Sequence, residues 1–239
     1  MNNEEIKKRC LNEIEILKEM NKNDYAIKYI KSFEEKNNDN NNFYIITELY
    51  DNNLKKEISN HKNGFNFEYI KKIFCQINDE LKYLKKINKL SYLDFKPENI
   101  LIQKIENKDK TFFYKYKLCD FFKTQKNSNE IYSNSSFPEE KFFFNYHDKS
   151  ILFNIGILLY ELYYGNEQTK FNKNKIKNDI KNGLKIKNEN DDLDDFNNLK
   201  NLIEECTNEE AKRIKWDDYF NHPFFNYEIK IKINIIKKI

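Results

Sequence analysis

The chain has 239 residues, of which 39% are hydrophobic and 15% aromatic, and this composition excludes a disordered chain. Its 42 basic and 39 acidic residues give a net charge of +3, which does not suggest nucleic-acid binding by a concentrated basic face. The four cysteines are widely spaced, and the most apolar run, residues 151–164, is too short to span a bilayer. We therefore expect a cytoplasmic protein with reduced thiols and with neither nucleic-acid nor membrane partners.

The first fifty residues combine one helical pattern with two strand-like runs. Apolar residues recur at helical spacing over residues 4–20. Residues 26–33 and 43–49 are rich in β-branched and aromatic side chains, which predicts two short strands. The acidic, Asn-rich stretch between them, residues 34–42, predicts an exposed loop.

The rest of the chain is predicted to be mainly helical, with a Pro-containing loop at residues 94–99. The expected helices cover residues 51–59, 68–89, 150–164, 173–182 and 193–206. The expected strands cover residues 100–103 and 112–119. Residues 121–146 predict a long irregular loop, and residues 227–239 alternate Ile with Lys or Asn in a strand-like pattern.

The most informative segment has the sequence YLDFKPENIL at residues 92–101. It resembles the catalytic loop of protein kinases, extended by the K-P-E-N of serine/threonine members. The resemblance implies that Asp94 is the base that accepts a hydrogen bond from the substrate hydroxyl and that Asn99 is a Mg²⁺ ligand. It implies that Lys96 balances charge on the transferred phosphoryl group. Tyrosine-specific members usually lack that lysine, so a Ser/Thr substrate is favoured.

A second segment, KLCDFF at residues 117–122, resembles the D-F-G motif with its glycine replaced by Phe122. The resemblance implies that Asp120 ligates the Mg²⁺ that bridges the ATP phosphates. It also implies that Phe121 packs beneath the glutamate-bearing helix of the kinase N-lobe. Residues 11–17 (LNEIEIL) resemble that helix, with Glu13 as its ion-pairing glutamate, although an ordinary exposed helix glutamate is an equally open interpretation.

Residues 43–50 resemble the strand that runs into the kinase hinge. This resemblance implies that Thr47 is the gatekeeper and that the backbones of Glu48 and Tyr50 face adenine. It also implies that Leu101 closes the adenine pocket from below.

Further similarities extend towards the end of the chain. Residues 137–139 resemble the A-P-E motif, residues 155–162 the buried central helix of the C-lobe, and residues 213–225 the closing segment of many Ser/Thr kinases. In the family the A-P-E glutamate pairs with a late arginine. The resemblance therefore implies a mostly buried ion pair between Glu139 and Arg213.

Together these matches imply an α+β, bilobal kinase-like fold with a truncated N-lobe and a mainly helical C-lobe. We expect an N-lobe remnant over residues 1–50, a C-lobe over residues 51–226 and a tail over residues 227–239. The chain as given begins at the glutamate-bearing helix, and none of its four glycines forms a G-x-G-x-x-G loop. We therefore expect the glycine-rich loop and the phosphate-binding lysine to be missing.

Two further departures lie in the catalytic loop, where Tyr92 and Leu93 replace the family's His and Arg. Because phosphoryl transfer depends on positioning and charge neutralisation, the expected loss of the glycine-rich loop together with the phosphate-binding lysine predicts much slower catalysis. Three interpretations stay open at this stage. The chain is a degenerate kinase that binds ATP and Mg²⁺ or a protein partner, a truncated record of an active Ser/Thr kinase acting on protein substrates, or a protein-interaction module.

Overall fold

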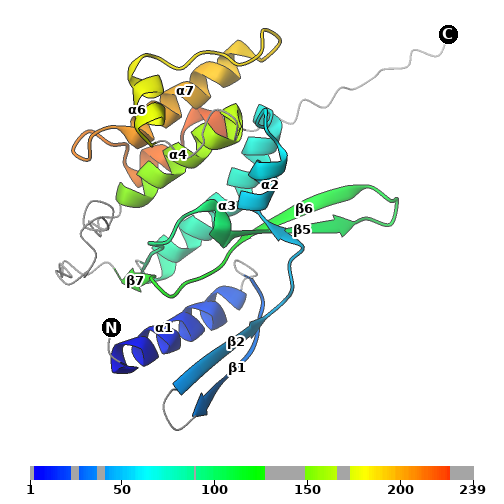
Figure 1. Ribbon diagram of the computed structural model, residues 1–239, viewed down its shortest axis with the longest axis vertical. Helices are drawn as coiled ribbons and strands as arrows, with labels where there is room; N and C mark the ends of the chain where they lie inside the picture. Colours follow the sequence, from blue (N-terminus) through cyan, green and yellow to red (C-terminus); the bar gives the residue numbers. More distant parts are fainter. Residues whose placement is uncertain are drawn as a thin grey trace.

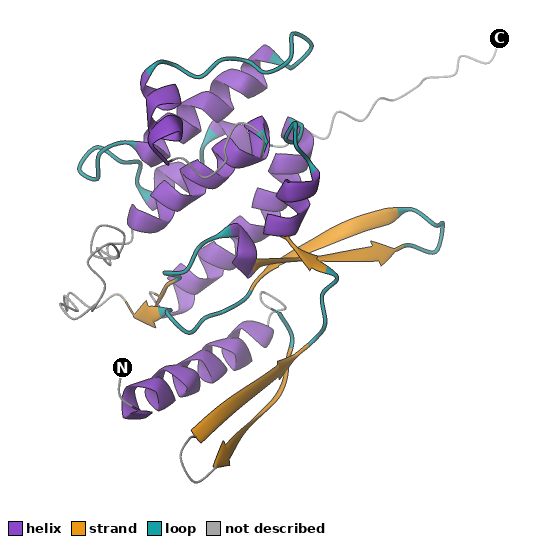
Figure 2. Cartoon of the chain, in the orientation of Figure 1, coloured by secondary structure: helices purple, strands orange, loops and turns teal. Residues whose placement is uncertain are grey.

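The computed structural model describes residues 3–22, 27–36, 41–88, 90–126, 149–165 and 173–226. Figure 1 shows one helix and a β-hairpin at one end of the molecule and a bundle of helices at the other, with a second hairpin between them. Figure 2 shows that the strands lie in the half that contains the N-terminal helix, whereas the other half is helical. The structure is α+β, as expected from the sequence, with a small sheet-containing N-terminal part and a helical C-terminal part.

The N-terminal part consists of one helix packed on a two-stranded hairpin. Its elements are α1 (Asn3–Asn21), β1 (Tyr29–Lys36) and β2 (Asn41–Thr47). The helix turns Ile14, Leu17 and Met20 inward, and all three are buried. The spacing of these residues matches the helical period, so they form one apolar stripe by which α1 packs on the rest of the fold.

The predicted loop over residues 34–42 is wrong at both ends. The antiparallel register of β1 and β2 continues to the pair Lys36 and Asn41, so residues 34–36 and 41–42 belong to strands. Phe33 and Tyr44 stack across the hairpin with ring centroids 4.9 Å apart. Cross-strand aromatic pairing of this kind stabilises a register that polar composition alone does not reveal.

The middle of the chain forms two helices and a three-stranded antiparallel sheet of order β3-β5-β6. The helices are α2 (Leu54–Asn60) and α3 (Phe67–Asn88), and the strands of the sheet are β3 (Asn52–Asn53), β5 (Ile100–Glu106) and β6 (Phe112–Leu118). The same part of the chain contains the short helical turn η1 (Pro97–Asn99) and the antiparallel pair of short strands β4 (Leu90–Ser91) and β7 (Gln125–Lys126). Helix α2 begins at Leu54, three residues later than the helix predicted over residues 51–59. Asn53 is its N-cap, and the Asn53 side chain accepts a hydrogen bond from the backbone N–H of Lys56 at 3.0 Å.

Side chains of α3 complete the outer edge of β6. Gln76 donates to the carbonyl of Tyr114 at 3.1 Å and accepts from the N–H of Tyr116 at 3.0 Å. The buried carboxyl of Glu80 accepts from the N–H of Leu118 at 2.8 Å. These bonds satisfy edge groups that would otherwise lack partners, and they fix the strand that leads into Asp120.

The C-terminal part is helical, with elements α4 (Lys149–Tyr164), α6 (Lys173–Lys181), α7 (Leu193–Thr207), α8 (Trp216–Phe220) and η3 (Pro223–Phe225). Helices α4 and α7 pack closely at Gly156. A Cβ atom at Gly156 would lie 2.8 Å from the Cβ of Cys206 and from the Cγ2 of Thr207. The glycine is therefore what permits this close helix–helix approach.

Two glycines and a lysine join the end of α4 to the loop that precedes α3. Gly64 has φ +69° and Gly165 has φ +79°, and a Cβ atom at Gly64 would lie 2.1 Å from the carbonyl oxygen of Tyr163. The Lys187 ammonium donates to the carbonyls of Tyr163 at 2.8 Å and Asn63 at 2.7 Å. A cation at a helix C-terminus satisfies carbonyls that have no partner within the helix.

Several sequence predictions lie outside the described residues, among them most of the irregular loop over residues 121–146 and the strand-like tail over residues 227–239. The division of the chain at residue 50 stays a prediction. Among the helices that the structure describes, none combines the length and the apolar character that crossing a membrane requires.

Candidate active site

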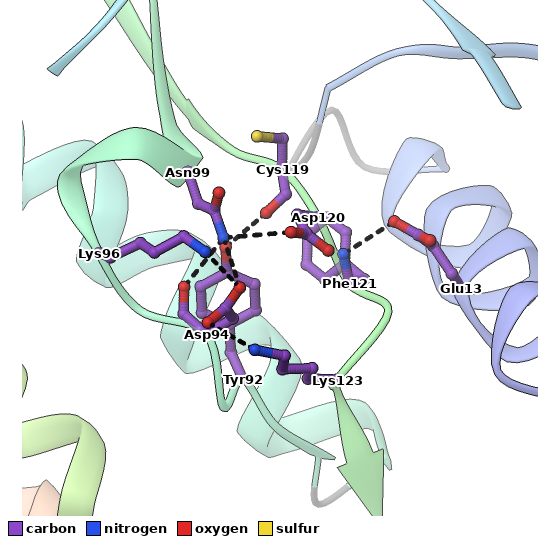
Figure 3. Close-up of polar contacts among 9 residues, drawn as sticks. All are labelled: Glu13, Tyr92, Asp94, Lys96, Asn99, Cys119, Asp120, Phe121 and Lys123. Carbon is purple, nitrogen blue, oxygen red and sulfur yellow. Dashed lines mark hydrogen bonds and ion pairs between the residues drawn. The ribbon is translucent and has the colours of Figure 1, made fainter. Parts of the chain in front are cut away.

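Residues 92–99 form a loop between β4 and β5 that lies against the segment after β6 (Figure 3). The backbone N–H of Cys119 donates to the carbonyl of Asn99 at 3.0 Å. Tyr92 is 1% exposed, its hydroxyl donates to the carbonyl of Cys119, and its ring centroid lies 5.3 Å from that of Phe121. The tyrosine that stands in place of the family's histidine therefore joins the two predicted motifs.

Asp94 is held by two ammonium groups. Lys96 Nζ lies 2.7 Å from Asp94 Oδ2, and Lys123 Nζ lies 3.3 Å from Asp94 Oδ1. Figure 3 shows the two lysines reaching the same carboxylate from different segments of the chain. Both oxygens of the predicted base are therefore engaged in ion pairs.

The side-chain amide of Asn99 joins Asp94 to Asp120. Asn99 Nδ2 donates to the carbonyl of Asp94 at 3.0 Å, to Asp94 Oδ2 at 3.1 Å and to Asp120 Oδ2 at 3.5 Å. Asp120 is exposed and has φ +61°, a left-handed conformation that Asp tolerates better than most residues. The structure thus brings Asp94 and Asn99 of the first motif together with Asp120 of the second.

The charges around Asp94 set its protonation state. Burial by itself raises the pKa of this carboxyl, but the hydrogen bond from Lys96 and the positive charge of Lys123 outweigh burial and lower the pKa below its ordinary value. For Lys96, burial lowers the pKa, and the bond to Asp94 more than restores it, so the net shift is upward. Asp94 is consequently an ionised but weakly basic carboxylate at neutral pH.

Helix α1 contacts the Asp-Phe-Phe turn directly. Glu13 Oε1 accepts a hydrogen bond from the backbone N–H of Phe121 at 2.9 Å, and Asn12 Nδ2 donates to the carbonyl of Thr124 at 2.9 Å. Burial raises the pKa of Glu13 to about 7, although the bond from Phe121 opposes this shift. Of the two interpretations left open by the sequence, the exposed glutamate does not fit, because Glu13 is half-buried and bound to the backbone.

The side chains of Asn99 and Asp120 each carry an oxygen atom of the kind that binds Mg²⁺. Mg²⁺ prefers hard oxygen ligands, takes only one or two protein carboxylates and completes its shell with water and substrate phosphates. Among the described residues no group of three or more His, Cys, Asp or Glu side chains could hold a metal by itself. Here the amide nitrogen of Asn99 faces Asp120, so joint ligation requires the amide to turn its oxygen towards the metal.

The residues expected around adenine lie at the end of β2, beyond it, and on β5. Thr47 is half-buried and its hydroxyl donates to the carbonyl of Glu48 at 3.3 Å, while the Glu48 N–H donates to the carbonyl of Lys28 at 2.9 Å. Tyr50 is buried, and Leu101 is half-buried on β5. Both backbone polar groups of Glu48 therefore already have a partner within the chain, and an adenine ring would compete for the N–H, whereas the carbonyl oxygen keeps a second lone pair.

The predicted ion pair between Glu139 and Arg213 is not tested, because Glu139 lies outside the described residues. Arg213 donates to the carbonyl of Asn208 from Nε at 3.2 Å and from an Nη at 3.0 Å. Its guanidinium also lies 5.2 Å from the ring centroid of Phe153 on α4.

Lys123 is the residue of this site that sequence reasoning missed. It lies three positions after Asp120, and its ion pair with Asp94 joins residues 29 positions apart. The available signal was a basic residue directly after the Asp-Phe-Phe segment, where the turn aims the side chain back at the catalytic loop. That signal is weak, because 42 of the residues are Lys or Arg.

Comparison with known proteins agrees with this geometry. A model of the protein kinase domain matches residues 1–225. The chain is also 32% identical over 129 residues to "Cyclin-dependent kinase-like 1" of Caenorhabditis elegans, an alignment that covers 54% of this chain and 33% of that relative. The chain thus spans well under two thirds of the relative's length. Because the family model covers nearly all of the sequence and the site brings the family's motifs together, the chain belongs to the protein kinase domain family.

Proposed function

We propose that this domain binds a magnesium–ATP complex at Asn99 and Asp120 and transfers its terminal phosphoryl group slowly to serine or threonine hydroxyls of proteins. The observation that carries this proposal is the position of the Asn99 amide, 3.1 Å from Asp94 Oδ2 and 3.5 Å from Asp120 Oδ2. A base and a metal ligand must lie this close for one nucleotide to be held and its phosphoryl group transferred.

Each residue has a distinct task in the proposed reaction. Asn99 and Asp120 hold the metal, which when bound neutralises the negative charge that the phosphates develop. Asp94, oriented by Asn99 and Lys96, accepts the hydrogen bond of the substrate hydroxyl. Lys96 lies 2.7 Å from Asp94 and can place its charge beside the transferred phosphoryl group.

Slow transfer follows from residues within the loop itself. Both oxygens of Asp94 are paired with ammonium groups, which makes the carboxylate a weak base. Leu93 stands where the family has the arginine that receives an activation-loop phosphate, so loop phosphorylation has no partner at this position. Removal of a single preorganised group can lower the rate by about 10²–10³, and several such groups differ here.

The test is a phosphotransfer assay with labelled ATP, using matched peptides that carry one Ser, Thr or Tyr. The wild-type chain should label the Ser and Thr peptides at a low rate and leave the Tyr peptide unlabelled. Asp94→Asn, which keeps the shape of the side chain, should abolish the labelling. Equal labelling by Asp94→Asn and wild type would contradict the assigned role of Asp94, and labelling of the Tyr peptide alone would contradict the substrate class.

A second candidate is a protein-binding scaffold that performs no catalysis. It is favoured by the packing of Tyr92, whose buried ring contacts both Phe121 and Phe95, with centroids 5.3 and 6.5 Å away. This aromatic packing can maintain the kinase fold without a nucleotide. Nucleotide-independent stability together with no labelling of any of the peptides would favour the scaffold.

A further inference from the structure

Lys123 lies beside Asp94 in the candidate site, at a position to which the kinase motifs assign no task. Its ammonium is 3.3 Å from Asp94 Oδ1, whereas the ammonium of Lys96 is 2.7 Å from Asp94 Oδ2. Figure 3 shows Lys123 approaching Asp94 from the segment that follows Asp120. Two cations therefore lie beside the predicted base.

The backbone at Lys123 is held by hydrogen bonds, while its side chain is partly exposed to solvent. The N–H of Thr124 donates to the carbonyl of Phe121 at 2.9 Å, which closes a turn around Lys123. Asn12 on α1 fixes the same turn through the carbonyl of Thr124 at 2.9 Å. The Lys123 side chain is 39% exposed. Its ammonium group sits at the end of a flexible four-carbon stem, so rotation of the side chain can reposition the ammonium without movement of the backbone.

The charges of the site make such a movement favourable when phosphates arrive. Asp94 and Asp120 contribute two carboxylates, and Lys96 and Lys123 contribute two ammonium groups. An ion pair that is partly open to water is weak, because the solvent screens it. A polyphosphate chain carries more negative charge than a single carboxylate, and lysine binds phosphate well as a point charge.

We propose that Lys123 is a phosphate-binding residue that leaves Asp94 Oδ1 and contacts the phosphate chain of a bound nucleotide. This inference rests on the proposed function, because it assigns Lys123 to the same nucleotide site. Its departure frees Asp94 Oδ1, the oxygen that Lys96 does not occupy, to accept the substrate hydroxyl. A single side-chain movement thus binds the phosphates and exposes the base.

The test is calorimetric titration of ATP with Mg²⁺ and of inorganic tripolyphosphate without metal. The proteins are wild type, Lys123→Met, Lys123→Arg and Lys104→Met. Lys104 is the matched control, because it is a lysine on β5 whose ammonium lies 3.8 Å from the ring centroid of Phe112. Lys123→Met should weaken the binding of both ligands by roughly 10- to 100-fold, the range expected for the loss of one hydrogen bond to a charged group. Lys123→Arg and Lys104→Met should bind as wild type does, and the effect should shrink as salt is added.

Adding Asp120→Asn to the series separates this inference from the proposed function. If Asp120→Asn loses magnesium-dependent ATP binding while Lys123→Met binds as tightly as wild type, the role of Lys123 is overturned and the magnesium site stands. If Lys123→Met alone loses tripolyphosphate, Lys123 is supported whatever happens to the magnesium site. Tighter binding by Lys123→Met, or no binding of either ligand to a folded wild type, overturns the inference.

Discussion

The backbone N–H of Phe121 donates a hydrogen bond of 2.9 Å to Glu13 Oε1, and this contact joins α1 to the Asp-Phe-Phe turn across 108 positions of sequence. Phe121 itself is fully buried, and its ring packs on Tyr92. Because the turn also carries Asp120 and Lys123, the contact from α1 helps to set the position of both charged side chains.

Replacement of Glu13 tests that contact. Glu13→Ala leaves the Phe121 N–H without its acceptor, and a buried donor in this condition costs about 1–3 kcal/mol. Glu13→Gln keeps an acceptor oxygen in the same place and should be at least as stable as wild type near neutral pH. Urea unfolding of the three proteins measures the difference, and equal loss of stability in both variants would show that the charge of Glu13, not its acceptor oxygen, holds the turn.

Gly64 offers a test of the loop against α4. Gly64→Ala places a Cβ atom 2.1 Å from the carbonyl oxygen of Tyr163 and forces an L-residue to adopt φ +69°. Gly183→Ala is the matched control, because Gly183 has φ +85° but nothing within 4 Å of its added Cβ. The left-handed backbone conformation alone costs an L-residue about 1–2 kcal/mol. Gly183→Ala should therefore lower the free energy of unfolding by that amount, and Gly64→Ala should lower it clearly more. Equal losses would contradict the close approach.

His222 predicts a loss of stability in weak acid. Its Nδ1 accepts from the N–H of Phe224 at 3.2 Å, so its Nε2 carries the proton in the bond to Asn201 Oδ1 at 2.9 Å. Burial lowers its pKa from the ordinary 6.5. In weak acid the unfolded chain therefore binds a proton at His222 more readily than the folded chain does. The contribution of the neutral His222 to the free energy of unfolding is complete above the unfolded pKa and is lost as the pH falls below that value.

The measurement is the free energy of unfolding between pH 5 and 8 for wild type and His222→Asn. The asparagine amide oxygen can still accept from Phe224 but does not titrate. Wild type should lose stability relative to the variant as the pH falls below about 6.5. Parallel pH profiles would contradict the buried, neutral imidazole.

The parts of the site predicted well from sequence are those with local spacing. Asp94 and Asn99 are five positions apart in one loop, and the short 3-10 turn η1 and the bond from Asn99 to the Asp94 carbonyl bring them together. The predicted helix over residues 68–89 likewise agrees with α3 to within one residue at each end, because the apolar residues of this 22-residue helix recur on one face along its whole length.

The contacts that sequence did not reveal join distant segments. Lys123 reaches Asp94, and Glu13 reaches the Phe121 backbone, only after β6 and α1 have been placed by packing. Strand β5 of the β5–β6 hairpin also extends beyond the predicted strand at residues 100–103, as far as Glu106, which pairs with Phe112. The extra residues lie towards the exposed end of the hairpin, where the sequence shows no clear alternation of apolar and polar residues.

The most direct test of the central claim is thermal unfolding of wild type and Asp120→Asn with and without Mg²⁺ and ATP. At a ligand concentration about 100 times Kd, binding stabilises the folded state by roughly 2.7 kcal/mol. For a chain of this size that corresponds to an increase in Tm of roughly 5–11 °C. The account predicts this increase in wild type, dependent on Mg²⁺, and its loss in Asp120→Asn. No increase in wild type, or an equal increase in both proteins, would contradict a magnesium–ATP site at Asn99 and Asp120.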